Sequence, residues 1–370
     1  MAKIRVLVVD DAVVVRRIVT DVLAADPDIE VVGTAANGRL ALAKLAQVTP
    51  DLVTLDIEMP ELDGLATLVE IRKLHRRLPV IMFSTLTERA ASATLDALAR
   101  GASDYVTKPS NVGSVTLAQE RIREELIPKI KALCGRKPLP AAPRPAPAAA
   151  PRVALPPRNP LPTRVDLLAI GVSTGGPNAL AAVIPALPAD FPIPVVIVQH
   201  MPPVFTRFLA ERLGSMSALR VREGEEGAVL EPGTVWIAPG NYHMGLRREH
   251  DRVRLALTQD PPENSCRPAV DPLFRSAADA YGGRVLGVVL TGMGHDGLAG
   301  AEIITRAGGT VLAQDEATSV VWGMPGAVAG AGLADQVLPL ERVASELILR
   351  AQTGRLPRLP GALPSRPLAC

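Results

Sequence analysis

A proline-rich stretch divides this chain into two parts. Residues 135–163 contain ten prolines, much of the remainder is alanine, and the charged side chains there are all basic. Such a segment cannot bury an apolar core and favours extended polyproline II structure. We expect an interdomain linker, although a proline-rich ligand for an adaptor domain would have the same composition. The expected boundaries are residues 1–125 for a first domain whose last helix runs to about 134, residues 164–352 for a second domain, and residues 353–370 for a disordered tail.

Composition narrows the class of protein. The formal net charge of +2 is too balanced to favour a nucleic-acid binder. The cysteines, Cys134, Cys266 and Cys370, are odd in number and have the spacing of neither a disulfide framework nor a zinc site. The N-terminus lacks the features of a signal peptide, and no apolar run approaches the roughly 20 residues that span a bilayer. We therefore expect a soluble, cytoplasmic protein without membrane insertion.

The first half alternates short apolar runs with helical patterns. This alternation predicts a doubly wound α/β domain, in which a parallel sheet is covered on both faces. The expected strands are Ile4–Val9, Val31–Ala35, Leu52–Leu55, Val80–Phe83 and Asp104–Val106, and the expected helices are Val13–Ala25, Leu40–Ala46, Gly64–Leu74, Glu88–Ala99 and Val115–Leu133.

The second half alternates less regularly and predicts a second parallel-sheet α/β domain. Three short strand-like runs in its middle suggest a small antiparallel insertion: Val235–Ala238, Tyr242–Leu246 and Val253–Leu257. The buried strands expected around it are Leu167–Gly171, Val195–Gln199 and Val285–Thr291, and the helices are Asn178–Leu187, Phe205–Gly214, Asp271–Tyr281 and Asp296–Ala307.

Carboxylates, a hydroxyl and an amine follow the expected strands of the first domain. Ligands of a doubly wound sheet bind at the carboxyl ends of its strands. Clustered carboxylates suit Mg²⁺, and a carboxylate beside Mg²⁺ can accept a phosphoryl group. Helix capping by the paired aspartates is the alternative, but several such residues at corresponding strand ends favour a site. The candidate residues are Asp10, Asp11, Asp56, Ser84 and Lys108.

These residues give the first domain its resemblance to a known family. The pair Asp10-Asp11, the run "DIEMP" at 56–60, Ser84 and Lys108-Pro109 resemble the flavodoxin-like receiver domain of bacterial response regulators. The resemblance implies that a histidine kinase phosphorylates Asp56. It also implies Mg²⁺ held by Asp10, Asp11, Asp56 and the backbone carbonyl of Glu58, with Ser84 and Tyr105 as switch residues and Lys108 as the phosphate contact.

A glycine-rich turn near the start of the second domain contains a candidate catalytic serine. Gly171-Val172-Ser173-Thr174-Gly175 lies between an expected strand and an expected helix. This pattern is typical of a nucleophile elbow, in which small residues allow a tight turn to present a serine. It does not fit the dinucleotide fingerprint or the P-loop. Taken alone, the motif leaves a nucleophile and a plain tight turn equally open.

Two further strand ends supply possible partners for Ser173. His200 ends the next expected strand, and Asp296 follows a later one, so the three side chains are expected at one sheet edge. They could act as nucleophile, base and orienting carboxylate. A core histidine and a helix-capping aspartate are the alternatives. The chain order of serine, histidine and aspartate differs from that of α/β-hydrolases, which indicates another fold.

The second domain resembles the catalytic domain of chemotaxis protein-glutamate methylesterases. The matching runs are "GVSTGGP" at 171–177, "QHMP" at 199–202, "RPAVDPLF" at 267–274, "TGMGHDG" at 291–297 and "AQDEATSVVWGMP" at 313–325. The resemblance implies hydrolysis of glutamate methyl esters and deamidation of selected glutamines on chemoreceptors, without a cofactor for that step. It assigns Ser173, His200 and Asp296 to the triad, Met293 to oxyanion support and Thr174 to a position beside the nucleophile.

Several alternatives remain open at the level of sequence. His295 precedes Asp296 directly, but we prefer His200 as the base because it ends its own strand. A DNA-binding response regulator and a non-catalytic receptor-docking protein are the rival functions. The expected regulation is that the unphosphorylated receiver covers the triad and that phosphorylation loosens this contact.

Overall fold

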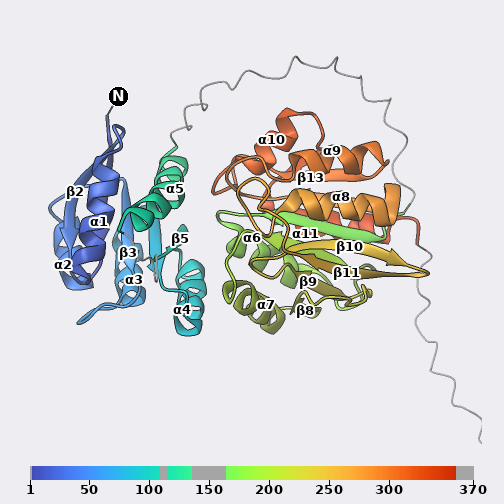
Figure 1. The fold of residues 1–370 in the computed structure, drawn as a ribbon, viewed down its shortest axis with the longest axis horizontal. Coiled ribbons are helices and arrows are strands. Elements are labelled where there is room, and N and C mark those ends of the chain that lie inside the picture. The colour runs from blue at the N-terminus through green and yellow to red at the C-terminus, as the bar shows by residue number, and fades with distance from the viewer. Residues whose placement is uncertain (1, 109–114, 136–163, 356–370) are drawn as a thin grey trace, which may run out of the picture.

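Two α/β units lie side by side in the computed structural model, which describes residues 2–108, 115–135 and 164–355 (Figure 1). The predicted proline-rich linker falls on residues 136–163 and most of the predicted tail on residues 356–370, and both lie outside the described residues. Helix α5 of the first unit ends at Leu133, and the first strand of the second unit begins at Leu167. The predicted domain boundaries stay a prediction.

The first unit is a five-stranded parallel sheet in the order β2-β1-β3-β4-β5, as expected for a doubly wound domain. Two of its central strands, Leu52–Asp56 and Val80–Ser84, are buried along their whole length, which explains their mostly apolar sequences. Side chains of Asn37, Asp63 and Thr87 cap three of the helices by accepting backbone N–H groups. The strands are β1 (Ile4–Val9), β2 (Ile29–Ala35), β3 (Leu52–Asp56), β4 (Val80–Ser84) and β5 (Asp104–Thr107), and the helices are α1 (Val13–Ala24), α2 (Gly38–Leu45), α3 (Gly64–Leu74), α4 (Glu88–Ala99) and α5 (Val115–Leu133).

The second unit is a seven-stranded parallel sheet in the order β14-β13-β12-β6-β7-β9-β8. The strands of this sheet are β6 (Leu167–Val172), β7 (Val195–Gln199), β8 (Arg220–Glu223), β9 (Thr234–Ile237), β12 (Val285–Val289), β13 (Thr310–Gln314) and β14 (Gln336–Leu338). The helices around it are α6 (Gly176–Val183), α7 (Phe205–Met216), α8 (Val270–Tyr281), α9 (Leu298–Arg306), α10 (Met324–Gly330) and α11 (Leu340–Gln352).

The expected antiparallel insertion is present but smaller than expected. Strands β10 (His243–Glu249) and β11 (Arg252–Thr258) pair antiparallel as a two-stranded ribbon. The third run assigned to the insertion, Val235–Ala238, was placed wrongly. It forms β9, which pairs parallel to β7 and β8 in the main sheet. A short apolar run carries no information about which strand it will pair with, so its neighbours could not be read from it.

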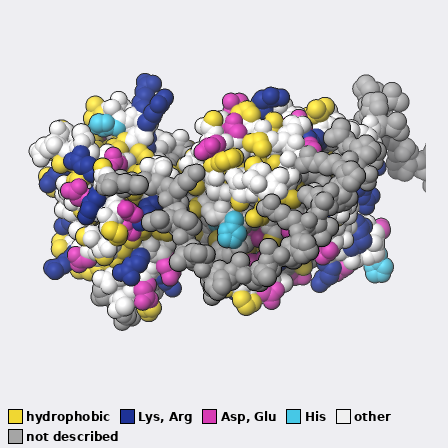
Figure 2. Space-filling model, turned by 90° about the horizontal axis from the view of Figure 1, so that it is seen from above, with side chains coloured by type: hydrophobic (Ala, Val, Ile, Leu, Met, Phe, Trp, Pro, Cys, Tyr) yellow, Lys and Arg dark blue, Asp and Glu magenta, His cyan; other side chains and the backbone are white. Residues whose placement is uncertain are grey.

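The outer surface of the molecule carries charges of both signs. Figure 2 shows Lys and Arg side chains lying among Asp and Glu side chains on the face that it displays. Mixed signs of this kind give little net attraction for a polyanion on that face. Within the described ranges, none of the helices combines the length and the apolarity needed to cross a bilayer.

Candidate active site and receiver site

The predicted acidic residues of the first unit meet at one edge of its sheet. Asp10 follows β1 and Asp56 ends β3, and both are 2% exposed, whereas Asp11 is exposed. One carboxylate oxygen from each of the three lies within 4.8 Å of the others. Lys108 Nζ lies 2.9 Å from Asp10 Oδ2 and 2.7 Å from Asp56 Oδ2. Three carboxylates facing one ammonium group leave net negative charge, and all-oxygen donors of this kind fit a hard divalent cation.

Burial sets the electrostatics of this site. It raises the pKa of Asp56 to about 6, against the opposing hydrogen bond and charge of Lys108. Burial also raises the pKa of Asp10, again against Lys108. For Lys108 itself burial acts to lower the pKa, but the bond to Asp56 and the charge of Asp10 prevail and raise it. A bound cation would therefore stabilise the ionised form of these carboxylates, which burial disfavours.

The predicted switch residues contact helix α4 and helix α5. Ser84 is buried and accepts a hydrogen bond of 2.7 Å from Thr94 Oγ1 of α4. Tyr105 on β5 is also buried, and its backbone carbonyl accepts a 2.7 Å bond from Lys129. Glu58 directs its backbone N–H toward Asp56 Oδ1 at 3.3 Å. The predicted role of the Glu58 carbonyl as a metal ligand stays a prediction.

Ser173 lies where the sequence predicted, in the turn between β6 and α6. Its N–H donates to Thr291 O, and its carbonyl accepts from Gly176 N and from Gln199 Nε2. Gly175 has φ of 77°, the left-handed region that favours glycine, and a Cβ there would lie 2.6 Å from Val320 side-chain atoms. The glycine is therefore required by both backbone conformation and space.

His200 and Asp296 also meet at this edge of the sheet. His200 Nε2 lies 2.8 Å from Asp296 Oδ2, and both side chains are largely buried. The Ser173 hydroxyl has no hydrogen-bond partner among the residues that the structure describes, so the serine–histidine contact is not formed in this state. All three side chains nevertheless belong to one site, because Ser173 and His200 line the same cavity. A loose nucleophile–base contact is common before substrate binds.

The position of Asp296 differs from the prediction. Helix α9 begins at Leu298, so Asp296 lies in the preceding loop and does not start the helix. Its carboxylate accepts backbone N–H groups of Val270, Asp271 and Gly297 in addition to His200. The aspartate is thus held by backbone donors from the start of α8 and from the loop before α9, and it faces His200.

The two partners shift each other's ionisation. Burial acts to lower the pKa of His200, but the hydrogen bond to Asp296 and proximity to the Cys266 thiol outweigh it and raise the pKa to about 9. Burial acts to raise the pKa of Asp296, but the hydrogen bond from His200 and the backbone donors lower it to about 2. The geometry thus favours an imidazolium–carboxylate pair, which is the state that a base reaches after taking a proton.

Two backbone N–H groups next to Ser173 are available to a ligand. In the described part of the chain, the N–H groups of Thr174 and Met293 donate to no acceptor, and both residues line the cavity with Ser173. Donors of this kind beside a nucleophile can stabilise an oxyanion. His295, the alternative base, is exposed, and Asp296 is bonded to His200 instead.

Comparison with known proteins matches two families to two parts of the chain. The family "CheB methylesterase" matches residues 168–347, and "Response regulator receiver domain" matches residues 6–119. A Trichodesmium erythraeum protein named protein-glutamate methylesterase/protein-glutamine glutaminase is 56% identical and covers 95% of this chain and 99% of its own length. A Nocardioides sp. protein of the same name is 57% identical over 98% of this chain and 100% of its own. The chain belongs to the CheB methylesterase family. The catalytic domain of Thermotoga maritima CheB has 47% identity and a TM-score of 0.49, covering 50% of this chain and 98% of that one.

In this CheB family member, a cavity of about 590 Å³ joins the two units at the candidate triad. Its wall on the catalytic side includes Ser173, His200 and Met293, and its wall on the receiver side includes Tyr105 and Glu125. The receiver therefore faces the nucleophile directly across a shared space.

Contacts beside the cavity hold the two units together. The Tyr105 ring stacks on Phe205, the first residue of α7, with ring centroids 5.0 Å apart and an interplanar angle of 6°. Arg212 Nη1 of α7 binds Asp96 Oδ1 of α4 at 2.7 Å, and Arg207 pairs with Glu88. The predicted switch residue Tyr105 is thus itself part of the interface.

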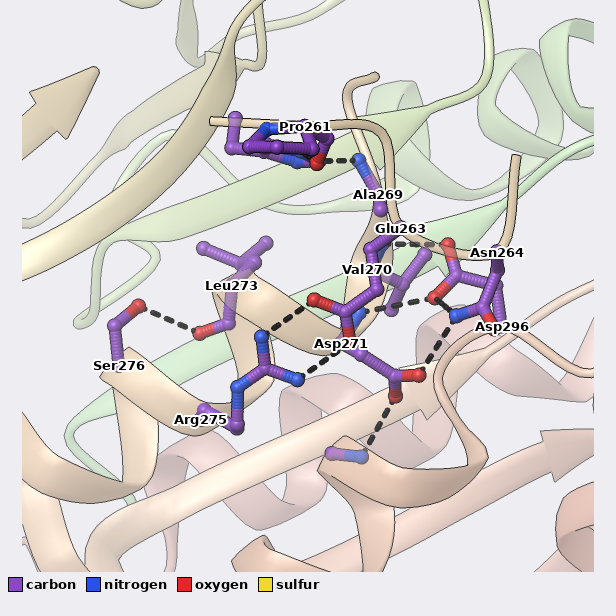
Figure 3. A network of polar contacts seen from close by, with 12 residues as sticks. Pro261, Glu263, Asn264, Ala269, Val270, Asp271, Leu273, Arg275, Ser276 and Asp296 are labelled. Atoms are coloured by element: carbon purple, nitrogen blue, oxygen red, sulfur yellow. Dashed lines mark hydrogen bonds and ion pairs between the residues drawn. The ribbon is translucent and has the colours of Figure 1, made fainter. Parts of the chain in front are cut away.

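Sequence reasoning missed a polar network behind Asp296 (Figure 3). The Asn264 amide bridges Asp296 and a second buried carboxylate, Asp271, and Glu263 pairs with Arg275 beside them. Asp271 was present in the quoted run "RPAVDPLF", but no pattern separated it from its neighbours. Asn264 lies in an irregular loop and carried no signal at all.

Proposed function

We propose that this protein is a phosphorylation-activated serine hydrolase that demethylates glutamate methyl esters on methyl-accepting chemoreceptors, releasing methanol, and deamidates selected receptor glutamines during sensory adaptation. The observation that carries the proposal is the 2.8 Å contact between His200 and Asp296 in a site that also holds Ser173. The names of the relatives supply the substrate class.

The chemistry assigns one step to each group. The Ser173 hydroxyl attacks the glutamyl carbonyl while His200 takes its proton, and Asp296 stabilises the resulting imidazolium. The N–H groups of Thr174 and Met293 donate to the oxyanion. His200 then returns the proton to the departing methanol, or to ammonia in deamidation. Finally, water activated by His200 hydrolyses the acyl-enzyme and frees Ser173.

Regulation follows from the receiver contact. A chemotaxis histidine kinase phosphorylates Asp56. Asp10, Asp11, Asp56 and the Glu58 carbonyl would hold Mg²⁺, which would supply positive charge beside the phosphoryl group. Ser84 leaves Thr94 for the new phosphoryl oxygens, Lys108 contacts them, and α4 and Tyr105 shift. Because α4 and Tyr105 carry the contacts to α7, the open state gains population.

Methanol release from methylated receptor membranes, with and without a small-molecule phosphodonor, tests the proposal. The wild type should release methanol and respond to the phosphodonor. Ser173→Ala should release none while still binding receptor, and Asp56→Asn should keep basal release but lose the response. Normal release by Ser173→Ala would refute the triad, and a full response by Asp56→Asn would refute the receiver assignment.

A further inference from the structure

The amide of Asn264 lies between two buried carboxylates that belong to different elements. Its Nδ2 donates to Asp296 Oδ1 at 2.8 Å and to Asp271 Oδ2 at 2.9 Å, and the two aspartates are 2% and 3% exposed (Figure 3). Both N–H bonds of the amide are therefore used, one on each carboxylate. Two carboxylates that share one amide donor lie close together. Without that donor they would repel each other strongly, because both are buried and poorly solvated.

We propose that Asn264 is a positioning residue for the hydrolysis, acting through Asp296 on His200. This inference rests on the function proposed above. Asp296 uses its two oxygens differently: Oδ2 holds His200 and the Val270 N–H, whereas Oδ1 takes the Asn264 amide and the N–H groups of Asp271 and Gly297. Among the described residues, Asn264 supplies the side-chain donor to Oδ1, so together with the two backbone donors it sets the plane in which Oδ2 meets the imidazole.

The backbone around Asn264 aims its amide. Glu263 and Cys266 exchange two backbone hydrogen bonds around a two-residue turn, and the turn residues have positive φ, 51° at Asn264 and 63° at Ser265. Turns of this kind favour asparagine. The Glu263 carboxylate also accepts both terminal nitrogens of Arg275 on α8, at 2.7 and 2.6 Å, which anchors the turn. The loop thus presents one amide in a fixed direction.

The neighbouring Asp271 gives the amide a second effect. Asp271 is buried in the first turn of α8, and its Oδ1 accepts Gly300 N at 2.7 Å. Without the Asn264 amide, Oδ2 of this carboxylate would face Asp296 with no donor between them. The negative potential at His200 would then rise and favour its protonated form, which cannot accept the proton of Ser173. The titratable groups that face the network are Asp296, Asp271, Cys266, Glu263, Arg275 and His243.

Two substitutions distinguish the effect of the Asn264 side-chain amide from the effect of its backbone conformation. Asn264→Gly keeps the left-handed conformation and deletes the amide, whereas Asn264→Asp keeps size and backbone preference but adds a third carboxylate. His250→Gly is the matched control, because His250 also has positive φ, 56°, but lies in the turn between β10 and β11 away from the triad. Thermal unfolding of all three variants shows whether each is folded.

The experiment uses full-length protein with phosphodonor, methylated receptor membranes and methanol detection from pH 6 to 10. Asn264→Gly should lower kcat about tenfold with KM little changed. The acid limb of its pH profile should move to higher pH, and that of Asn264→Asp should move further, by about one unit. NMR titration of labelled His200 should show the same order without any turnover. His250→Gly should behave as the wild type.

The outcomes distinguish this inference from the function on which it rests. If the wild type releases no methanol, the proposed function fails, whereas the NMR titration still reports on Asn264. If the wild type is active and both folded Asn264 variants keep its pH profile and the His200 titration, Asn264 does not position the triad. The inference is also overturned if kcat falls only in proportion to a loss of thermal stability while the pH profile of methanol release and the NMR titration of His200 stay unchanged.

Discussion

Burial of His200 and its contacts with Asp296 and Cys266 set its pKa and therefore the pH dependence of turnover. Its pKa of about 9 means that the imidazole is mostly protonated at neutral pH in the state described here, although the base must be neutral to accept the serine proton. Methanol release should therefore rise with pH up to about 9. Initial rates at constant ionic strength and saturating phosphodonor measure this directly.

The variant Cys266→Ala provides the control for that pH profile. The Cys266 thiol is one of the groups that raise the pKa of His200, so its removal should move the acid limb to lower pH. A wild-type rate that is already constant below pH 7 would contradict the ionisation of His200 described above.

At the residue scale, the sequence predicted side chains in the loops that follow buried strands and missed Asn264, which lies in an irregular loop. Ser173 and His200 follow apolar runs, and parallel strands bring their carboxyl ends to one edge, so their meeting followed from topology. Asn264 depends on two residues with positive φ and on an ion pair between Glu263 and Arg275, none of which has a periodic signature. The contacts of a residue in an irregular loop cannot be predicted from a periodic sequence pattern.

At the element scale, helices α4 and α7 carry the contact between the two units. Asp96→Arg should turn its pairing with Arg212 into repulsion and raise methanol release without phosphodonor. Both side chains are partly exposed, so the rise should be modest, about three- to fivefold. The double variant Asp96→Arg/Arg212→Asp restores opposite charges and should return release to the wild-type level.

A charge reversal elsewhere on the receiver serves as the matched control. Asp21→Arg changes an exposed carboxylate on α1, whose ion partner Arg17 is on the same helix, and should leave the unphosphorylated rate unchanged. Equal stimulation by Asp21→Arg and Asp96→Arg would show that net charge, and not the α4–α7 contact, controls the rate.

Strands at the edges of the second sheet, and β13 next to one edge, were the hardest to predict. The central strands β6, β7 and β12 are wholly buried and stand out as apolar runs, whereas β14 has two exposed residues of three and gave no signal. Strand β9 was recognised as a strand but assigned to the wrong sheet. A strand that is buried on both faces has a continuous apolar sequence, which can be recognised. Which strands pair with each other depends on long-range contacts, and a local sequence does not predict these.

At the scale of the whole molecule, the apolar core continues from one unit into the other. Tyr105 and Leu95 of the receiver belong to the same buried cluster as Phe205 and Leu209 of α7. The resemblance of each half to a known family predicted two domains and a regulatory contact that involves the Ser84/Tyr105 face of the receiver, but not the side chains of α7 that meet it. We propose that the stacking of Tyr105 on Phe205, the first residue of α7, couples phosphorylation to access to the triad.

Cys266 offers a direct measure of that access, because it lines the cavity between the units together with Ser173. In a Cys134→Ser/Cys370→Ser background it is the remaining thiol of the three in the chain. Phosphodonor should accelerate its alkylation by iodoacetamide about fivefold, followed by intact-mass spectrometry, since opening the interface exposes it. Asp56→Asn in the same background should abolish the acceleration. If phosphodonor stimulates methanol release but leaves the alkylation rate unchanged, activation proceeds without opening this cavity, and the receiver controls the triad in another way.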